Sequence, residues 1–372
     1  MAARQQASAK LEALEVRNIR NIEALGLDPS PGTNVICGAN GQGKTSLLEA
    51  IYLVATTRSF RTHRLRETIR HGTDGGSAKA RFEDMLGDRE QVVGLTPTQR
   101  SVRVDGQRPA SLAQYAVKTP VVVFHPGELA LTMGPASGRR TLLNRIALFF
   151  DPTTHAVQHA YGEAMRARQR LLQVQGPQAQ GLEAYERLMV EHGMRITRFR
   201  QDVAEKLANV ARGVLDQATF GSLRLDARYV PGGSLDEQEE CKRLVASRSQ
   251  DCRRSSSTHG PHRDEFLLEI NGASTRTDAS QGQHRLLTLC LKIAEMVCVG
   301  QARGVNPILL LDDVSSELDA ERTEAFFDLL GHRNEQVFLT TTRAEMLSVF
   351  ERKMGETNVF WMKGGQIGGK PW

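Results

Sequence analysis

The sequence predicts an α/β protein with a buried, mainly parallel sheet and an inserted helical lobe. Short apolar segments such as 121–124 and 308–311 alternate with helical patterns, which is typical of strands buried on both faces of a parallel sheet. One apolar segment, 34–37, stops at Gly38, and a helical pattern follows from Lys44. The middle of the chain lacks these strand signals, so we expect two lobes of different architecture.

The first lobe is expected to form from both ends of the chain. Alternating apolar residues and turn signals predict strands at 11–16, 22–27, 34–37, 78–82, 91–95, 101–104 and 121–124. Later in the chain they predict strands at 266–270, 308–311 and 337–340 and a terminal hairpin at 359–367. A polar run at 255–258 marks the return to this lobe, which therefore comprises 1–125 and 255–372.

The inserted lobe, 126–254, is predicted to be helical. Helical patterns cover 153–175, 181–219 and 235–254, and Gly176-Pro177 separates the first two. The second segment carries a heptad-like seam, formed by Leu182, Tyr185, Met189, His192, Ile196, Phe199 and Val203. Two interpretations remain open: a short antiparallel hairpin of coiled-coil type, or two helices packed on a globular lobe.

Composition excludes several classes of protein. Of 372 residues, 40% are hydrophobic and 24% are charged, which are ordinary globular values. No apolar run approaches the roughly 18 residues that a membrane span needs, and the first ten residues do not resemble a secretory signal. We therefore expect a cytoplasmic protein with no membrane partner. Five cysteines without a C-x-x-C pair argue against a disulfide framework or a structural zinc site.

The net charge of +5 is concentrated in parts of the chain. Residues 139–212 hold twelve basic and seven acidic residues, an excess equal to that of the whole chain. A second basic segment contains Glu67 and five arginines, namely Arg58, Arg61, Arg64, Arg66 and Arg70. Such patches indicate a polyanionic partner such as nucleic acid, although a solvated basic surface is the alternative.

Residues 38–45, GANGQGKT, match the phosphate-loop pattern G-x-x-x-x-G-K-[ST]. The segment lies between a predicted strand and a predicted helix, where backbone N–H groups and the helix N-terminus can face a phosphate chain. Lys44 would neutralise the β- and γ-phosphates of ATP, and Thr45 would bind Mg²⁺. The predicted nucleotide-binding residues of this loop are Gly38, Asn40, Gly41, Gly43, Lys44, Thr45 and Ser46.

Two acidic residues, Asp312 and Asp313, follow the apolar segment 308–311. A carboxylate at the end of a buried parallel strand can hold Mg²⁺, and the next one can orient the attacking water. We assign Asp312 to the metal, together with Thr45, and Asp313 to the water. The predicted catalytic groups are thus Lys44, Asp312 and Asp313.

A second anion site is predicted at the start of a helix, about 30 residues before Asp312. A serine hydroxyl, a glycine and a positive helix end come together there, in Ser280, Gly282 and Gln283. The spacing resembles the ABC-type signature, with which one subunit of a dimer caps the nucleotide held by the other. Residues 316–319 are similar to the D-loop of the same proteins. An ordinary helix cap is the alternative interpretation of Ser280.

Several segments together resemble the RecF family, bacterial recombination and replication-repair ATPases related to SMC proteins but without their long arms. The segments are 38–50, 58–62 (RSFRT), 123–140, 260–266 (GPHRDEF), 279–285 (ASQGQHR) and 309–319. RSFRT and GPHRDEF are more specific than the general ATPase motifs.

The resemblance implies an ABC-type P-loop ATPase head with an inserted helical lobe. It implies an ATP-dependent homodimer that binds double-stranded DNA and single-strand/double-strand junctions and has weak DNA-dependent ATPase activity. With RecR, and RecO in the wider pathway, the dimer would help to load RecA at gaps. The five arginines of 58–70 would then contact DNA.

Some positions depart from the ABC pattern. Thr341-Thr342 replace the usual histidine, and Glu128 is nominated where a glutamine is usual. Asp313 replaces a longer glutamate, and because its side chain reaches less far toward water, slow turnover is expected. Two other classes of protein share the general ATPase motifs. An SMC-like structural DNA tether would need hundreds of heptad residues. A transporter-coupled ABC ATPase would need a membrane partner and would leave the arginines unexplained.

Overall fold

The computed structural model describes residues 7–313, 335–354 and 357–368. The chain divides into two compact units. The first unit comprises 1–128 and 285–372, and the second, here called the helical unit, comprises 129–284. Among the described residues, no helix is long and apolar enough to cross a lipid bilayer.

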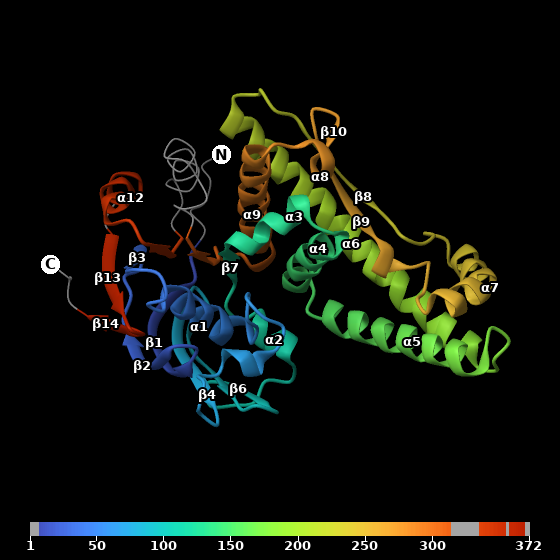
Figure 1. Ribbon diagram of the computed structural model, residues 1–372, viewed down its shortest axis with the longest axis horizontal. Helices are drawn as coiled ribbons and strands as arrows, with labels where there is room; N and C mark the ends of the chain where they lie inside the picture. The colour runs from blue at the N-terminus through green and yellow to red at the C-terminus, as the bar shows by residue number, and fades with distance from the viewer. Residues whose placement is uncertain (1–6, 314–334, 355–356, 369–372) are drawn as a thin grey trace. The chain divides into compact units, whose positions relative to one another are not determined.

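A six-stranded sheet forms one layer of the first unit, in the order β14-β13-β3-β12-β11-β7 (Figure 1). Its strands are β3 (Thr33–Cys37), β7 (Val121–Phe124), β11 (Ile308–Leu311), β12 (Val337–Thr341), β13 (Thr357–Lys363) and β14 (Gln366–Gly368). Neighbouring strands are parallel except for the pair of β13 with β14. Every residue of β3, β7, β11 and β12 is buried, as the continuous apolar segments predicted. The α/β fold class is confirmed.

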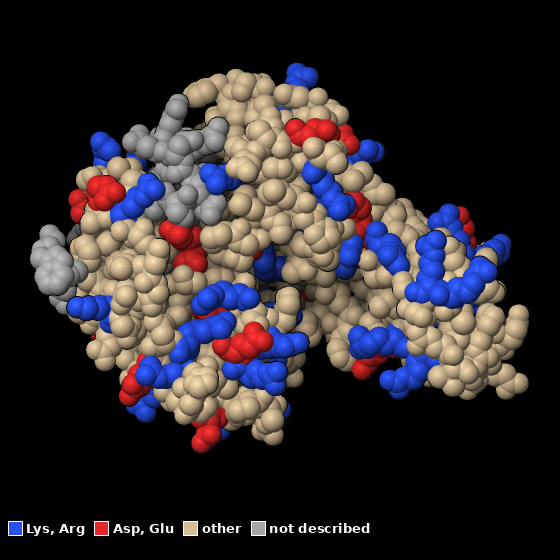
Figure 2. All heavy atoms as spheres, in the orientation of Figure 1, with Lys and Arg blue, Asp and Glu red and all other residues tan. Residues whose placement is uncertain are grey.

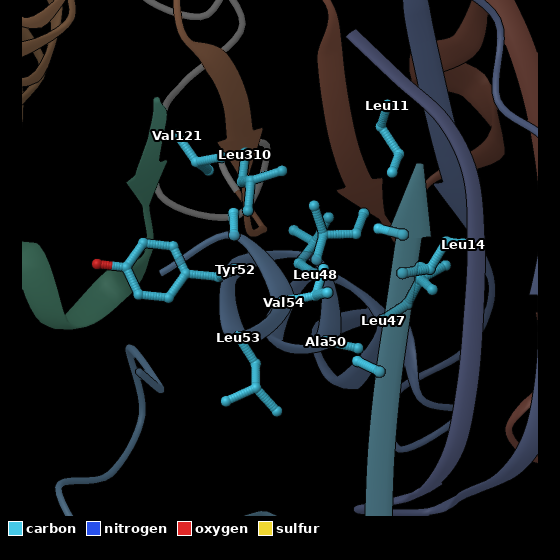
Figure 3. Close-up of a cluster of buried hydrophobic side chains, with 14 of the residues drawn as sticks. Leu11, Leu14, Leu47, Leu48, Ala50, Tyr52, Leu53, Val54, Val121 and Leu310 are labelled. Carbon is cyan, nitrogen blue, oxygen red and sulfur yellow. The ribbon is translucent and has the colours of Figure 1, made fainter. Parts of the chain in front are cut away.

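An antiparallel sheet forms a second layer, in the order β2-β1-β4-β5-β6. Its strands are β1 (Lys10–Ile19), β2 (Ile22–Leu27), β4 (Gly76–Asp84), β5 (Gly87–Leu95) and β6 (Arg100–Val104). Helix α1 (Lys44–Thr56) is buried on nearly all sides, and its side chains pack with Leu14 of β1 and Leu310 of β11 (Figure 3). The core therefore surrounds the helix that follows the phosphate loop. The shorter α2 (Leu112–Ala116) and α12 (Leu347–Met354) also belong to this unit.

The helical unit is built on two long helices, α5 (Thr154–Gln175) and α6 (Leu182–Thr219). Both lie within two residues of their predicted bounds. It also contains α3 (Ala130–Met133), α4 (Ala136–Phe150), α7 (Glu237–Arg254), α8 (Thr275–Asp278) and the strands β8 (Leu225–Val230), β9 (Glu265–Ile270) and β10 (Ala273–Ser274). The seam residues Met189 and Ile196 share a buried cluster with Leu244 of α7. The structure thus favours helices packed on a globular lobe.

The predicted boundary at residue 255 differs from the observed one, because 255–284 fold with the helical unit. Strand β9 pairs antiparallel with β8, which was not predicted. The buried Asp264, in GPHRDEF, accepts hydrogen bonds from Arg200 of α6 and Tyr229 of β8. This pairing joins segments far apart in the sequence, so the local pattern after residue 255 could not reveal it. Helix α9 (Gln281–Arg303) begins in the helical unit and continues into the first unit.

Candidate functional site

The phosphate loop connects β3 to α1, and its glycines permit its shape. Gly43 has a φ of 110°, a left-handed conformation that glycine adopts without strain. A Cβ atom at Gly38 would overlap the carbonyl oxygen of Met362 in β13. The turn between β13 and β14 also holds the loop, because Gly364 N–H donates to Gln42 Oε1 at 2.7 Å. The loop is therefore positioned by the strand beside it as well as by α1.

Lys44 lies at the first position of α1 and is buried. Its Nζ donates hydrogen bonds to the carbonyl oxygens of Gly38, at 2.7 Å, and Ala39, at 2.8 Å. Burial lowers the pKa of Lys44, while the charges of Asp313 and Asp312 oppose that change. The ammonium group is thus held beside the backbone N–H groups at the start of the helix, where a phosphate chain can accept from both.

Asp312 lies at the end of β11 beside the loop, and two threonines orient it. Thr45 Oγ1 and Thr340 Oγ1 each donate to Asp312 Oδ1 at 2.9 Å. Burial raises the pKa of Asp312, the two hydroxyl hydrogen bonds lower it, and the neighbouring Asp313 raises it again. Hydroxyl and carboxylate oxygens are ligands that Mg²⁺ prefers, so Thr45 and Asp312 fit a magnesium ion.

Asp313 has a φ of 53°, a conformation uncommon for residues other than glycine. Its backbone N–H donates to Thr340 Oγ1 at 2.9 Å. Backbone strain of this kind is concentrated at functional sites. Thr340, at the end of β12, thus holds both acidic residues, although it is not among the predicted site residues.

A cavity of about 530 Å³ brings most of the predicted loop residues and both acidic residues together. It is lined by Asn40, Lys44, Thr45, Ser46, Asp312 and Asp313, among others. Its volume is in the range of small-molecule sites. Arg20, Asn21, Ile69, His71 and Thr340 also line it and were not predicted. The signal that could have found Thr340 is its place at the end of a parallel strand next to β3.

The five arginines of 58–70 do not share one environment. Arg61 lines the cavity, and its Nη1 lies 3.4 Å from Oε2 of the fully buried Glu49 of α1. Glu49 also forms a two-pronged ion pair with Arg20, at 2.9 and 2.8 Å. Arg70 donates to the carbonyl oxygen of Asn21 at 3.1 Å and lies 3.3 Å from Glu23.

The remaining arginines of this segment, Arg58, Arg64 and Arg66, are exposed. Arg61 is also exposed, with 42% of its side chain accessible, but Arg61 and Arg70 both hydrogen-bond within the protein. Arg64 lies 3.9 Å from Glu67. Lys and Arg side chains also gather on the surface over α7 and its neighbouring helices (Figure 2). Contact of the five arginines with DNA stays a prediction.

Ser280 and Gln283 form a reciprocal helix cap at the start of α9. Gln283 N–H donates to Ser280 Oγ at 3.2 Å, and Ser280 N–H donates to Gln283 Oε1 at 2.8 Å. Ser280 is exposed, and Gly282 and Gln283 are half-buried. These hydrogen bonds are those of a helix cap, which was the alternative interpretation of Ser280. Contact of these three residues with a nucleotide stays a prediction.

Two of three further predicted positions lie within the described residues. The D-loop-like residues 316–319 lie outside the described residues. Thr341 ends β12, where its Oγ1 accepts from Arg343 N–H at 3.0 Å. Glu128 is buried, with its Oε1 3.6 Å from Lys292 Nζ of α9.

Comparison with known proteins identifies the class. The chain matches the RecF/RecN/SMC N terminal domain family over residues 10–360. A solved structure of the recombination mediator protein RecF-ATP in the RecFOR pathway is 26% identical, covers 100% of both chains and has a TM-score of 0.87. An Smc head domain from Pyrococcus furiosus, 14% identical with a TM-score of 0.55, covers 96% of this chain and 95% of its own and shares the fold. The protein therefore has the ABC-type ATPase head of the RecF and SMC proteins.

The particular family follows from curated relatives. The DNA replication and repair protein RecF of an Anaeromyxobacter species is 35% identical over 368 residues, which is 96% of this chain and 98% of the relative. RecF of Myxococcus xanthus is also 35% identical and covers 96% of this chain and 97% of its own. This chain belongs to the RecF family, and the predicted resemblance is confirmed.

Proposed function

We propose that this protein is an ATP-dependent DNA-binding protein of recombinational repair and replication restart. The observation that carries the proposal is the cavity that joins Lys44, Thr45, Asp312 and Asp313 at the ends of parallel strands. The relatives named above are DNA replication and repair proteins, and one solved relative is described with ATP. We place the protein in the cytoplasm, where its DNA substrate lies.

Within this cavity each side chain has a distinct role in ATP hydrolysis. The backbone N–H groups of 38–45 and Lys44 Nζ bind the phosphates, and Lys44 exchanges the carbonyl oxygens of Gly38 and Ala39 for phosphate oxygens. Thr45 and Asp312 would hold Mg²⁺, which neutralises charge on the β- and γ-phosphates. Asp313 orients the attacking water. Its short side chain supports slow, switch-like turnover that DNA stimulates.

ATP would bring two copies of the chain together. Ser280, Gly282 and Gln283 lie at the exposed start of α9, where a hydroxyl, backbone N–H groups and the helix dipole favour an anion. In the dimer, these residues of one copy cap the γ-phosphate held by the other. The hydrogen bond between Ser280 and Gln283 would then be exchanged for contacts with the nucleotide.

The dimer would bind double-stranded DNA beside single-strand gaps and at single-strand/double-strand junctions. Exposed Arg58, Arg64 and Arg66 support phosphate contacts, which would make binding strongly salt-dependent and weakly sequence-dependent. RecR, and RecO in the wider pathway, would act with it to load RecA, in line with the RecFOR pathway named for the solved relative. An SMC-like tether is less well supported, because α5 and α6 have 22 and 38 residues and a tether needs hundreds.

Sedimentation velocity with and without ATP, Mg²⁺ and a gapped duplex tests this proposal. We expect a monomer without ATP, a dimer with ATP, and a heavier species that retains DNA. Ser280→Arg should bind ATP as a monomer but not dimerise, whereas Ser249→Arg, at an exposed serine of α7, should behave like the parent. ATP-dependent dimers that never retain DNA would favour a transporter-type ATPase. Equal dimerisation of Ser280→Arg and the parent would refute the capping role.

A further inference from the structure

Helix α6 ends at an aromatic residue in an unusual position. Phe220 follows Thr219 with a φ of 48°, and its side chain is 98% exposed. Its backbone N–H closes the helix by donating to the carbonyl oxygen of Asp216. Glycine or asparagine usually occupies this left-handed position at the end of a helix, because other side chains crowd the backbone there.

Neither property of Phe220 favours folding of the helical unit by itself. The left-handed backbone is unfavourable for an L-residue with a Cβ atom, because the Cβ atom crowds the following carbonyl oxygen. The exposed ring gains nothing from burial within the unit. A single exposed apolar residue is ordinary on a protein surface, so its location has to decide whether it has a role.

Hydrogen bonds connect the Phe220 turn to the segment that leads to Ser280. Arg224 N–H donates to Asn271 Oδ1 at 2.8 Å, and Asn271 N–H donates to the carbonyl oxygen of Arg224 at 2.9 Å. Asn271 begins the turn between β9 and β10, and α8 then leads to Ser280. The end of α6 and the cap of α9 therefore belong to one end of the helical unit (Figure 1).

A second exposed apolar residue lies at the same end. Met133, at the end of α3, is 49% exposed. Its neighbour Thr132 accepts a hydrogen bond from Thr275 of α8 and lies 3.1 Å from Nδ1 of His284 in α9. Two large apolar side chains thus accompany Ser280 at this end, where they could contact whatever approaches Ser280.

We propose that Phe220, supported by Met133, is an apolar anchor for a second copy of this chain in the ATP-dependent dimer. The proposal rests on the proposed function, in which Ser280 meets the nucleotide of the second copy. Aromatic residues that become buried near the centre of an interface commonly dominate its affinity. The left-handed turn keeps the ring in solvent until the second copy covers it.

The test replaces Phe220 with asparagine, which tolerates the left-handed backbone. We expect Phe220→Asn to weaken ATP-dependent dimerisation at least tenfold, equivalent to about 1.4 kcal/mol. Nucleotide binding by the monomer should not change, and its melting temperature should be equal or higher. A defect in folding would instead lower the melting temperature.

Val174→Asn is the matched control, because Val174 is also an exposed apolar residue, at 75%. It lies near the end of α5, shortly before the start of α6, whereas Phe220 follows the end of α6. The 38 residues of that helix span about 57 Å. This control should dimerise like the parent. Phe220→Trp should keep most of the affinity of dimerisation, because it retains an aromatic ring.

Each outcome of sedimentation with ATP decides between the proposals. A parent that stays monomeric refutes the proposed dimer and the anchor with it. If the parent dimerises and Phe220→Asn dimerises equally well, the anchor alone is refuted. The anchor is also refuted if Phe220→Asn dimerises normally but loses retention of gapped DNA, since the ring would then serve DNA.

Discussion

Thr340 Oγ1 donates a hydrogen bond to Asp312 Oδ1 at 2.9 Å and accepts one from the backbone N–H of Asp313, also at 2.9 Å. One hydroxyl at the end of β12 thus orients both acidic residues at the end of β11. The geometry of the cavity depends on a side chain that is neither in the phosphate loop nor acidic.

Thr340→Val should therefore reduce ATP hydrolysis more than ATP binding. Valine keeps the volume but removes both hydrogen bonds, and an unpaired buried polar group costs about 1–3 kcal/mol, which corresponds to a rate loss of about 5- to 150-fold. Phosphate release and binding of a fluorescent ATP analogue would measure the two effects. Thr341→Val is the control, because Thr341 Oγ1 accepts from Arg343 N–H instead. Equal rates for both variants would contradict the role of Thr340.

The charged carboxylate of Asp312 should destabilise the fold at neutral pH, whereas the protonated carboxyl at acid pH should not. Burial raises its pKa above the ordinary 3.8 in the folded state. Its protonation therefore stabilises the fold below that ordinary value, and this stabilisation is lost as pH rises through the raised pKa. Asp312→Asn should melt at a higher temperature than the parent at pH 7 without Mg²⁺ and nucleotide. The difference should shrink toward pH 4, and a difference independent of pH would contradict the cause.

Lys44→Arg should bind nucleotide within a few-fold of the parent but hydrolyse it at least about tenfold more slowly, because a planar guanidinium does not replace a compact ammonium. In the structure, Lys44 Nζ donates hydrogen bonds to the carbonyl oxygens of Gly38 and Ala39, a geometry that suits a compact ammonium group. Single-turnover hydrolysis beside equilibrium binding separates the two effects. A variant that loses binding and hydrolysis in equal proportion would show that Lys44 serves ATP binding alone.

Arg66 and Arg61 should differ in the ligand that they affect. Arg66→Ala removes an exposed charge, so the slope of log affinity for DNA against log salt should fall by about 0.9. ATP binding should not change. Arg61 lines the cavity, so Arg61→Ala should weaken ATP binding by the monomer in the absence of DNA. DNA titrations over a range of salt, with nucleotide binding measured in parallel, would test this difference. An unchanged salt slope for Arg66→Ala, or unchanged ATP binding for Arg61→Ala, would contradict it.

Arg168→Met should strongly destabilise the helical unit. The fully buried Arg168 donates to Glu186 at 3.0 Å and to Asp251 at 2.7 Å. Loss of one partner from a buried ion pair costs about 3–5 kcal/mol. Urea unfolding should show this loss, and Arg170→Met, at an exposed position of the same helix, should unfold like the parent. A change below 1 kcal/mol, on the scale of an exposed ion pair, would show that Arg168 is dispensable.

Elements with a strong local pattern were predictable. Helix α6 was predicted from the apolar seam that begins at Leu182, and β7 matches its predicted range. The phosphate loop was predictable because its glycine and lysine spacing serves the loop's own backbone. In contrast, β8 was missed because its pairing with β9 joins Leu225 to Ile270.

Local sequence patterns suffice to predict the α/β class, the loop 38–45, the acidic end of β11 and the long helices, because these depend on neighbouring residues and their periodicity. That Thr340 orients Asp312 and that Arg61 lines the cavity became visible only in the folded chain. The tertiary structure also assigned 255–284 to the helical unit. These contacts join distant parts of the chain: Thr45 and Asp312 share a hydrogen bond across 267 positions, and the packing of α1 and β11 in one core brings them together.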